Sequence, residues 1–425
     1  MLNNNQKLKI HFLLFTNHNL YDSMNIIYMK RSEYFLEKYM NSHLRELIKN
    51  QSDFLDEIVQ KYLKVVCRRF PVDDSCIDNL LKIENFKIEP IGINSKGKAG
   101  ALIEDFQEKT CTLKYNMKMF PNIDLAFLKN EIPEGLTGKD LADYKYQVIR
   151  HIIIFLHELT HALNFVEFLK YDETVQNFRE LTLEDTNKDN YTFYIAHGGL
   201  ITDKKIIQQN EITRAVNLNK NYIYEALTEF IAHNVLLDDE FSDIQYFYND
   251  NEKIDPYNVG WSYSPFVNIV FVLNYLFNEA FSMAYFTGET KISGFDNSCL
   301  NFNITDISVP LKSIVEYFND NKKNDFILND CVHTLVNGIK KFLDFAEETL
   351  ERKDVRKHLN DFKIDSLHEE IKNVCNFYCY LRFIAEDTHS EIDKEDIERL
   401  KNILESEFSN IDTRNLTEYI DNLNY

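Results

Sequence analysis

A long segment without helix breakers constrains the fold of this chain more than any other feature. From Asp140 to Lys170 the sequence contains neither glycine nor proline, and Thr137 or Asp140 can cap its start. Its apolar residues, from Ile152 through Val166, fall on nearly every side of a helix. A helix that is apolar all round is buried. The sequence therefore predicts a buried helix over this segment.

Ahead of that helix the spacing of apolar residues changes. Phe86–Ile93 alternates between apolar and polar positions, and Ala99–Ile103 and Cys111–Met117 follow after polar residues. Alternation with a period of two is typical of strands. We expect three short strands that form a small sheet over the buried helix. Helices are expected before them, at Ser32–Lys49 and Ser52–Cys67, where apolar residues recur at helical spacing.

The rest of the chain is predicted to be largely helical. Residues 171–220 are mixed and polar, with a loop at His197–Gly199, and apolar helices are expected at Asn221–Leu237 and Phe266–Phe286, with a long loop at 250–265 between them. The fold class is therefore α+β. We expect an N-terminal helical region at 1–82, a lobe with the strands and the buried helix at 83–170, a helical lobe at 171–306 and a C-terminal helical region at 307–425.

The composition is that of a globular protein and argues against some functions. Of the 425 residues, 44% are apolar and 27% are charged, and the net charge is −21. Such a surface repels phosphate groups, so we expect no nucleic-acid partner and no binding to anionic membranes. No apolar run approaches the length of a membrane span, and the first residues lack the apolar region of a signal peptide. We expect the protein to act in a cytoplasm, with signal-less export into a host cell as an alternative.

The cysteines do not indicate a disulfide framework or a zinc ribbon. The chain has seven, an odd number, and no pair has the spacing of zinc-ribbon ligands. Cys375 and Cys379 lie four residues apart on a predicted helix and are interpreted as small core residues. A reducing compartment suits this pattern.

The motif that carries chemistry lies on the buried helix, at His157-Glu158-Leu159-Thr160-His161. Residues four apart project from the same face of a helix, so both imidazoles can bind one zinc ion. Zinc lowers the pKa of a bound water to about 7, and Glu158 can then take its proton as the water attacks a carbonyl. Two imidazoles and a carboxylate on an apolar helix would be costly without a shared partner, and zinc provides one.

A catalytic zinc has three protein ligands and one open position, so a third ligand is needed. On the second apolar helix, Glu225, Glu229 and His233 follow at intervals of four residues. Glu225 would complete a site of two histidines and one glutamate, and Glu229 would accept the second N–H of a ligand histidine. The alternatives are that Glu229 is the ligand, or that both acids are surface residues. His233 is interpreted as a helix histidine bonded within the protein.

These motifs resemble those of the gluzincin metallopeptidases. In that group an HExxH helix is followed by a glutamate ligand on a later helix, often with an acid four residues on, as at Glu225 and Glu229. The resemblance covers about residues 86–237 and implies a zincin-like core with one zinc ion. It also implies that the strand Thr112–Met117 is an edge strand that holds an extended substrate. The gap between His161 and Glu225 is longer than in the shortest-spaced members.

Peptide hydrolysis also requires a donor to the developing oxyanion. Related enzymes use a tyrosine or histidine from a later segment, which makes Tyr263 and Tyr285 the candidates. His197, beside two glycines, could lie on a substrate loop. A second sequence, His368-Glu369-Glu370-Ile371-Lys372, begins like a zinc motif but ends in lysine, and we interpret it as a solvated helix face.

The sequence therefore predicts a zinc metalloendopeptidase that hydrolyses a protein or peptide substrate. His157, His161 and Glu225 bind the metal, Glu158 is the base, and the cleft lies between the strand-containing lobe and the helices after residue 171. The chain also resembles bacterial toxin and effector zinc proteases, including clostridial neurotoxin light chains, in length and in the first motif. The rival hypothesis is a non-catalytic zinc-containing protein that binds partners through its acidic helical C-terminal region. A fourth protein ligand, such as His197 or His233, would favour that rival.

Overall fold

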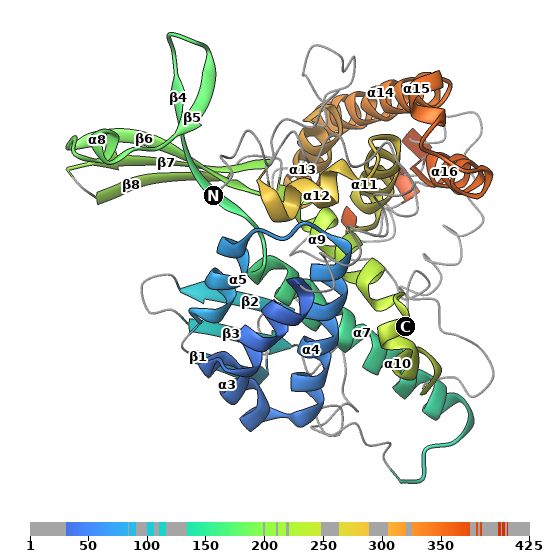
Figure 1. Cartoon of the computed structure of the whole chain (residues 1–425). Helices are drawn as coiled ribbons and strands as arrows, with labels where there is room; N and C mark the ends of the chain where they lie inside the picture. The colour runs from blue at the N-terminus through green and yellow to red at the C-terminus, as the bar shows by residue number, and fades with distance from the viewer. Residues whose placement is uncertain are drawn as a thin grey trace. The chain divides into compact units, whose positions relative to one another are not determined.

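The computed structural model describes an α+β protein in which helices predominate (Figure 1). It describes residues 31–83, 85–90, 100–105, 110–115, 134–198, 200–209, 211–217, 221–247, 263–288, 305–319 and 325–374, with 380, 383–384, 398–400, 402–403 and 406. The predictions for residues 1–30, 91–93, 116–117, 250–262 and 289–304, and for Cys375 and Cys379, lie outside these residues. The chain divides into two compact units that are discontinuous in sequence: Met1–Pro90 with Gly100–Leu163 and Asn234–Pro256, and Ile91–Ala99 with Asn164–His233 and Tyr257–Tyr425.

The first unit begins with helices. Residues 31–40 are helical, and α3 (His43–Gln51), α4 (Asp53–Arg69) and α5 (Asp74–Leu81) follow. The prediction of one helix over Ser32–Lys49 is wrong, because Ser42 ends the first helix and caps α3 by accepting a hydrogen bond from the Arg45 N–H at 3.2 Å. The predicted helix at Ser52–Cys67 is confirmed as α4, and Ser52 caps its start.

A three-stranded sheet follows, as the alternating apolar residues predicted. It contains β1 (Asn85–Pro90), β2 (Gly100–Asp105) and β3 (Thr110–Tyr115) in the order β1-β3-β2. β3 pairs with β1 in parallel and with β2 in antiparallel fashion. The expectation that this strand is an edge strand is therefore wrong. Both of its sides already pair within the sheet, so it has no row of backbone groups left for an extended peptide.

The helix that carries the HExxH motif is α7 (Gly138–Ala162), in the same unit as the three-stranded sheet. It is buried as predicted: Ile152, Leu156 and Leu159 are no more than 5% exposed. The sheet packs on it, since β2 contacts α7 and the rings of Phe86 and Phe155 lie 6.3 Å apart. The helix ends eight residues before the predicted end at Lys170, because the chain continues as a strand.

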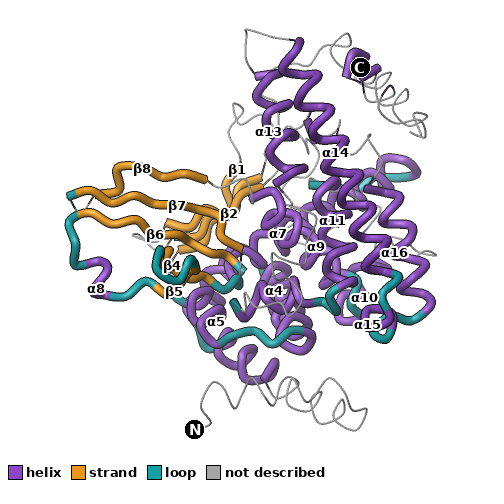
Figure 2. The backbone as a smooth tube through the Cα atoms, turned by 90° about the horizontal axis from the view of Figure 1, so that it is seen from above, coloured by secondary structure: helices purple, strands orange, loops and turns teal. Residues whose placement is uncertain are grey.

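A five-stranded antiparallel sheet occupies residues 166–217, where the sequence analysis expected a mixed, polar part of a helical lobe. Its strands are β4 (Val166–Asp172), β5 (Asn177–Glu180), β6 (Asn190–His197), β7 (Leu200–Gln208) and β8 (Glu211–Asn217), in the order β5-β4-β6-β7-β8, and α8 (Leu183–Thr186) connects β5 to β6 (Figure 2). The sequence analysis did not predict this sheet, for a physical reason. Among the described strand side chains only Leu169, Ala196 and Ile207 are buried, so neither face shows the apolar alternation that marks a strand in sequence.

The second apolar helix, α9 (Asn221–Leu236), agrees with the prediction, and the boundary between the two units falls inside it. Its last residues, in the first unit, are held by α4. The Arg69 side chain donates to the Asn234 carbonyl at 3.2 Å, and Arg68 pairs with Asp238 at 2.6 Å. The short helices η1 (Asp239–Phe241) and α10 (Ser242–Phe247) follow. α4 is therefore bonded to the end of α9 that belongs to the first unit.

The third apolar segment forms two helices instead of the predicted one. α11 (Ser264–Leu276) and α12 (Ala280–Thr287) meet at a bend of 97°. Asn278 and Glu279 between them have positive φ angles of 53° and 61°. The Asn274 side chain stabilises the break, since its oxygen accepts from the N–H and the hydroxyl of Ser282 at 3.0 and 3.1 Å. A buried polar side chain thus ends an apolar helix that the sequence pattern predicted to continue.

The remaining described chain is helical, as predicted. It comprises α13 (Thr305–Asn319), α14 (Asp325–Leu350), α15 (Lys353–Arg356) and α16 (Asp361–Val374). α13 and α14 pack closely at Gly338, where a Cβ atom would lie 2.3 Å from the Asp306 carbonyl oxygen. His368 is exposed on α16, as expected for a solvated face. Among the described helices, none alone is both long and apolar enough to cross a membrane. α11 and α12 have the required length and apolar character only when they are taken together, and they are bent at their junction.

Candidate metal centre

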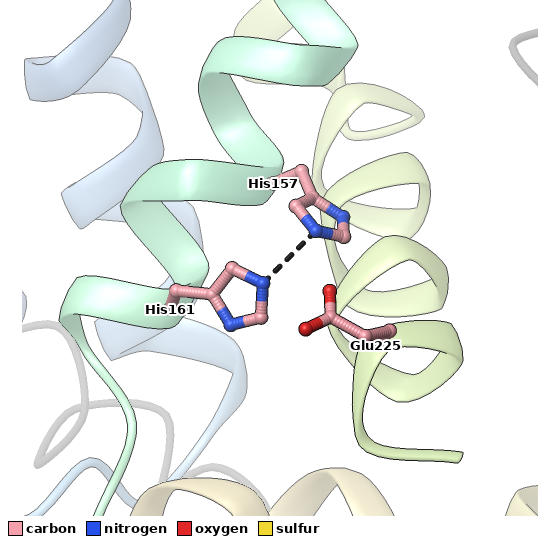
Figure 3. A group of neighbouring side chains, drawn as sticks. All are labelled: His157, His161 and Glu225. Atoms are coloured by element: carbon pink, nitrogen blue, oxygen red, sulfur yellow. Dashed lines mark hydrogen bonds between the residues drawn. The ribbon is translucent and has the colours of Figure 1, made fainter. Parts of the chain in front are cut away.

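The two histidines of the HExxH motif face each other across one turn of α7. Their Nε2 atoms lie 3.0 Å apart, and the ring planes are nearly perpendicular, at 83° (Figure 3). Both side chains are half-buried. At this distance one ring nitrogen can donate a proton to the lone pair of the other, and the tautomers decide which one donates. A cation that accepts both lone pairs can take the place of that proton.

Glu225 completes a three-residue group with the histidine pair. It lies on α9, is half-buried, and its carboxylate points toward the two imidazoles (Figure 3). One ligand atom from each of His157, His161 and Glu225 lies within 4.8 Å of the other two. The structure therefore brings together the three residues that the sequence analysis chose as ligands.

The donor set and spacing fit a zinc ion. Two imidazole nitrogens and one carboxylate oxygen are a known ligand set of catalytic zinc. Tetrahedral coordination at about 2.0–2.1 Å places two nitrogen ligands roughly 3.3–3.4 Å apart. The observed 3.0 Å between the Nε2 atoms is within a small rotation of the side chains from that value. We therefore take His157, His161 and Glu225 as the residues that would hold the metal.

The motif helix is tied to α4 directly beside the ligands. Thr160 donates to the Leu156 carbonyl at 2.7 Å, and the fully buried Tyr62 hydroxyl lies 2.8 Å from the Thr160 hydroxyl. Because the Thr160 proton is used within the helix, Tyr62 is the donor. Burial raises the pKa of Tyr62 far above its ordinary value, so this proton stays in place. Glu158, the predicted base, is also buried, at 7% exposure.

Glu229 and His233, one and two turns after Glu225, are buried. Glu229 accepts a hydrogen bond from the backbone N–H of Tyr263 at 2.9 Å, and its other oxygen lies 3.9 Å from Nε2 of His233. Glu229 thus anchors the start of α11. Its role toward a ligand histidine stays a prediction, and so does the role of the half-buried Tyr263 side chain.

The structure places Tyr285 in a buried polar network. Its hydroxyl lies 2.9 Å from that of Thr228 and 3.5 Å from that of Tyr224, and the Tyr285 and Tyr224 rings are stacked at 5.7 Å. Tyr285 is fully buried. His197 is the last residue of β6 and not part of a loop, and its Nδ1 lies 3.1 Å from the amide nitrogen of Asn164. As an oxyanion donor Tyr285 stays a prediction, but its hydroxyl is already bonded within the protein.

Asn164 and Tyr224 were missed by the sequence analysis. The Asn164 amide donates to the Tyr224 hydroxyl, and both side chains are buried, at 5% and 7% exposure. A signal did exist in the sequence. Asn164 is a polar residue within a long apolar run and directly follows the motif helix, and Tyr224 directly precedes Glu225.

A third histidine of α7 lies in a different environment. His151 is 4% exposed, and burial, assisted by the charge of Arg150, lowers its pKa to about 4. It is therefore neutral at pH 7. Its position six residues before His157 places it on another face of the helix.

Comparison with known proteins gives no independent assignment: no family model, curated protein or solved structure matches this chain.

Proposed function

We propose that this protein is a zinc-dependent metallopeptidase with a zincin-like core. The observation that carries the proposal is the convergence of His157, His161 and Glu225, from two helices, on one position. In this proposal Glu158, which is buried on α7 next to the first ligand, is the base that hydrolysis requires. The arrangement of a three-stranded sheet packed on the motif helix is compatible with such a core.

Each residue has a distinct task in this proposal. His157, His161 and Glu225, all half-buried, would hold the metal. Zinc in such a site supplies Lewis acidity, which acidifies water and polarises a carbonyl. The Glu158 carboxylate takes the proton of the attacking water and passes it to the leaving amine. Tyr62, through Thr160, holds this turn of the helix in place.

A catalytic site suits the geometry better than a structural zinc site, which has four protein ligands. Within the described part of the chain, the ligand group contains three residues. The two histidines that would have favoured the rival hypothesis lie elsewhere: His197 on Asn164, and His233 beside Glu229. A metal held by three protein ligands would have a coordination position open for water.

The substrate class that fits best is a protein or peptide. The net charge of −21 disfavours nucleic acid as a partner. Action in a cytoplasm, including that of a host cell as a toxin or effector, remains part of the proposal.

The test compares the wild-type chain with Glu158→Gln, which removes the proton acceptor but keeps the size and the ligands. Both proteins are loaded with zinc, their metal content is measured, and each is incubated with a cell lysate whose new peptide termini are sequenced. We expect about one zinc per chain in both, and cleavage that falls by about 10²- to 10⁴-fold in the variant. A wild-type protein that binds zinc but produces no more termini than Glu158→Gln would contradict the peptidase proposal.

A further inference from the structure

We propose that Asn164 and Tyr224 form a positioning couple that sets where the zinc ligands of α7 and α9 lie. This inference rests on the proposed zinc site but not on peptide hydrolysis. Asn164 comes three residues after His161 along the chain, and Tyr224 comes one residue before Glu225. The hydrogen bond from the Asn164 amide to the Tyr224 hydroxyl therefore links the chain just beyond one ligand to the chain just before another.

The backbone beside Asn164 is fixed by two further elements. The Phe165 N–H donates to the Tyr285 carbonyl at 3.0 Å, and the Gly198 N–H donates to the Phe165 carbonyl at 2.8 Å. Gly198 has a φ angle of +54°, and a Cβ atom there would lie 2.9 Å from Cα of Tyr285. Only glycine allows this close approach. Asn164 is thus presented from a rigid segment, as a positioning residue requires.

Both protons of the Asn164 amide have acceptors. One goes to the Tyr224 hydroxyl, and the other points to Nδ1 of His197 at 3.1 Å. Because an amide nitrogen only donates, Nδ1 of His197 accepts and that imidazole carries its proton on Nε2. The two acceptors fix the rotation of the amide, so the side chain has one orientation.

Tyr224 is held equally firmly on its own helix. Its ring stacks on that of Tyr285, with 12° between the planes, and lies 5.2 Å from the ring of His197. The Thr228 hydroxyl donates to the Tyr224 carbonyl at 2.9 Å, one turn along α9. A shift of this turn of α9 would carry Glu225 with it, because adjacent residues of a helix move together.

The expected consequence is a change in metal affinity and in ligand geometry. Residues that orient metal ligands from outside typically contribute about 10- to 100-fold in affinity. Tyr224→Phe removes only the hydroxyl and keeps the stacked ring, so we expect zinc to bind about 10-fold more weakly. Asn164→Ala removes both amide bonds, and we expect a loss nearer to 100-fold.

The test is a zinc titration of the full chain against a chromophoric chelator, on the wild type, Tyr224→Phe, Asn164→Ala and the double variant. The matched control is Tyr39→Phe, which also removes a buried tyrosine hydroxyl, the one bonded to Asp56 at 3.0 Å, and lies far along the chain from the ligands. We expect the double variant to match Asn164→Ala within about 2-fold, since both changes remove the same bond. The visible spectrum with Co²⁺ in place of zinc should change in Tyr224→Phe and not in Tyr39→Phe.

The outcomes separate this inference from the proposed function. An unchanged zinc affinity and an unchanged Co²⁺ spectrum in Tyr224→Phe would overturn the proposal that the two residues position the ligands. A double variant whose fold-loss of zinc affinity equals the product of the two single fold-losses would also overturn it. Should Asn164→Ala fail to fold, Tyr224→Phe still decides. A wild-type protein that binds no zinc overturns both proposals. One that binds zinc without cleaving peptides overturns only the peptidase, because the titration requires no turnover.

Discussion

The two helices that carry the candidate metal ligands, α7 and α9, each have a pair of ligand-type side chains one turn apart, and the two pairs differ in burial. On α7, His157 and His161 are half-buried, with their Nε2 atoms 3.0 Å apart and Glu225 nearby. On α9, Glu229 and His233 are buried, 3.9 Å apart, and Glu229 is bonded to the backbone of Tyr263. The same spacing of four residues thus yields a half-buried pair close to a third ligand-type side chain, and a buried pair whose acid accepts a hydrogen bond from the backbone of Tyr263.

Ligand-type side chains four residues apart on a helix therefore indicate a candidate metal site, and their burial and contacts distinguish a candidate from a structural pair. A buried acid beside a histidine stabilises the fold by satisfying polar groups. A half-buried histidine pair with a converging carboxylate offers lone pairs to an ion. This difference in role between the two pairs can be tested by substituting one residue of each pair and comparing the effects of the two substitutions.

The largest difference is expected between His161→Ala and His233→Gln. Removing one of three direct ligands should empty the site at neutral pH, whereas His233→Gln should retain close to one zinc per chain. Metal content after dialysis against a weak chelator measures both. Loss of zinc from the His233 variant with circular dichroism unchanged would reverse the comparison, because His233 would then belong to the metal site.

A smaller difference is expected between the two acids of α9. Glu225→Ala should weaken zinc binding by more than the roughly 10- to 100-fold typical of residues outside the ligand set. Glu229→Ala should stay within that range. Alanine maintains the helix in both, so competitive zinc titration compares them directly. If Glu229→Ala is the variant that empties the site, the ligand assignment on α9 is one turn wrong.

Glu229 should instead contribute to stability. In Glu229→Ala the Tyr263 N–H loses its acceptor, and we expect the free energy of unfolding to fall by about 1–3 kcal/mol. Glu229→Gln keeps an oxygen for this hydrogen bond and should recover most of the loss. Urea denaturation of the zinc-free proteins measures both variants. Equal stability of the alanine and glutamine variants would show that the bond to Tyr263 contributes nothing.

The smallest effect concerns His151, the buried histidine of α7. Its folded pKa of about 4 lies below the unfolded value of about 6.5, so the unfolded chain binds a proton first as the pH falls. The contribution to stability is complete above pH 6.5 and is lost progressively toward pH 4. Relative to His151→Leu, the wild type should lose about 1 kcal/mol between pH 8 and pH 5.5, measured with chelator present so that zinc release does not contribute. Parallel pH profiles of the two proteins would contradict the buried, neutral state of His151.

Much of the ligand-bearing architecture was predictable because its signals are local. The apolar surroundings of α7 and the start and end of α9 follow from helical periodicity, and the strands β1–β3 follow from alternation. The spacing of His157 and His161 on a helix fixes their relation without any other part of the chain. Other features left no local signal. Among the described side chains of β4–β8 only three are buried, so the strand period does not appear as apolar alternation, and no glycine or proline marks the end of α7 at Ala162.

The sequence by itself thus determined the two helices, the histidine pair and the two acids from which a third ligand was predicted to come. Only the tertiary structure decided that Glu225 joins the histidines and that Glu229 turns to Tyr263. It also placed β3 at the centre of its sheet and Asn164 against Tyr224. The physical reason is that helix geometry alone sets how two residues one turn apart lie relative to each other. Which of two acids one turn apart on α9 lies near the histidines depends instead on packing between segments that are distant in the sequence.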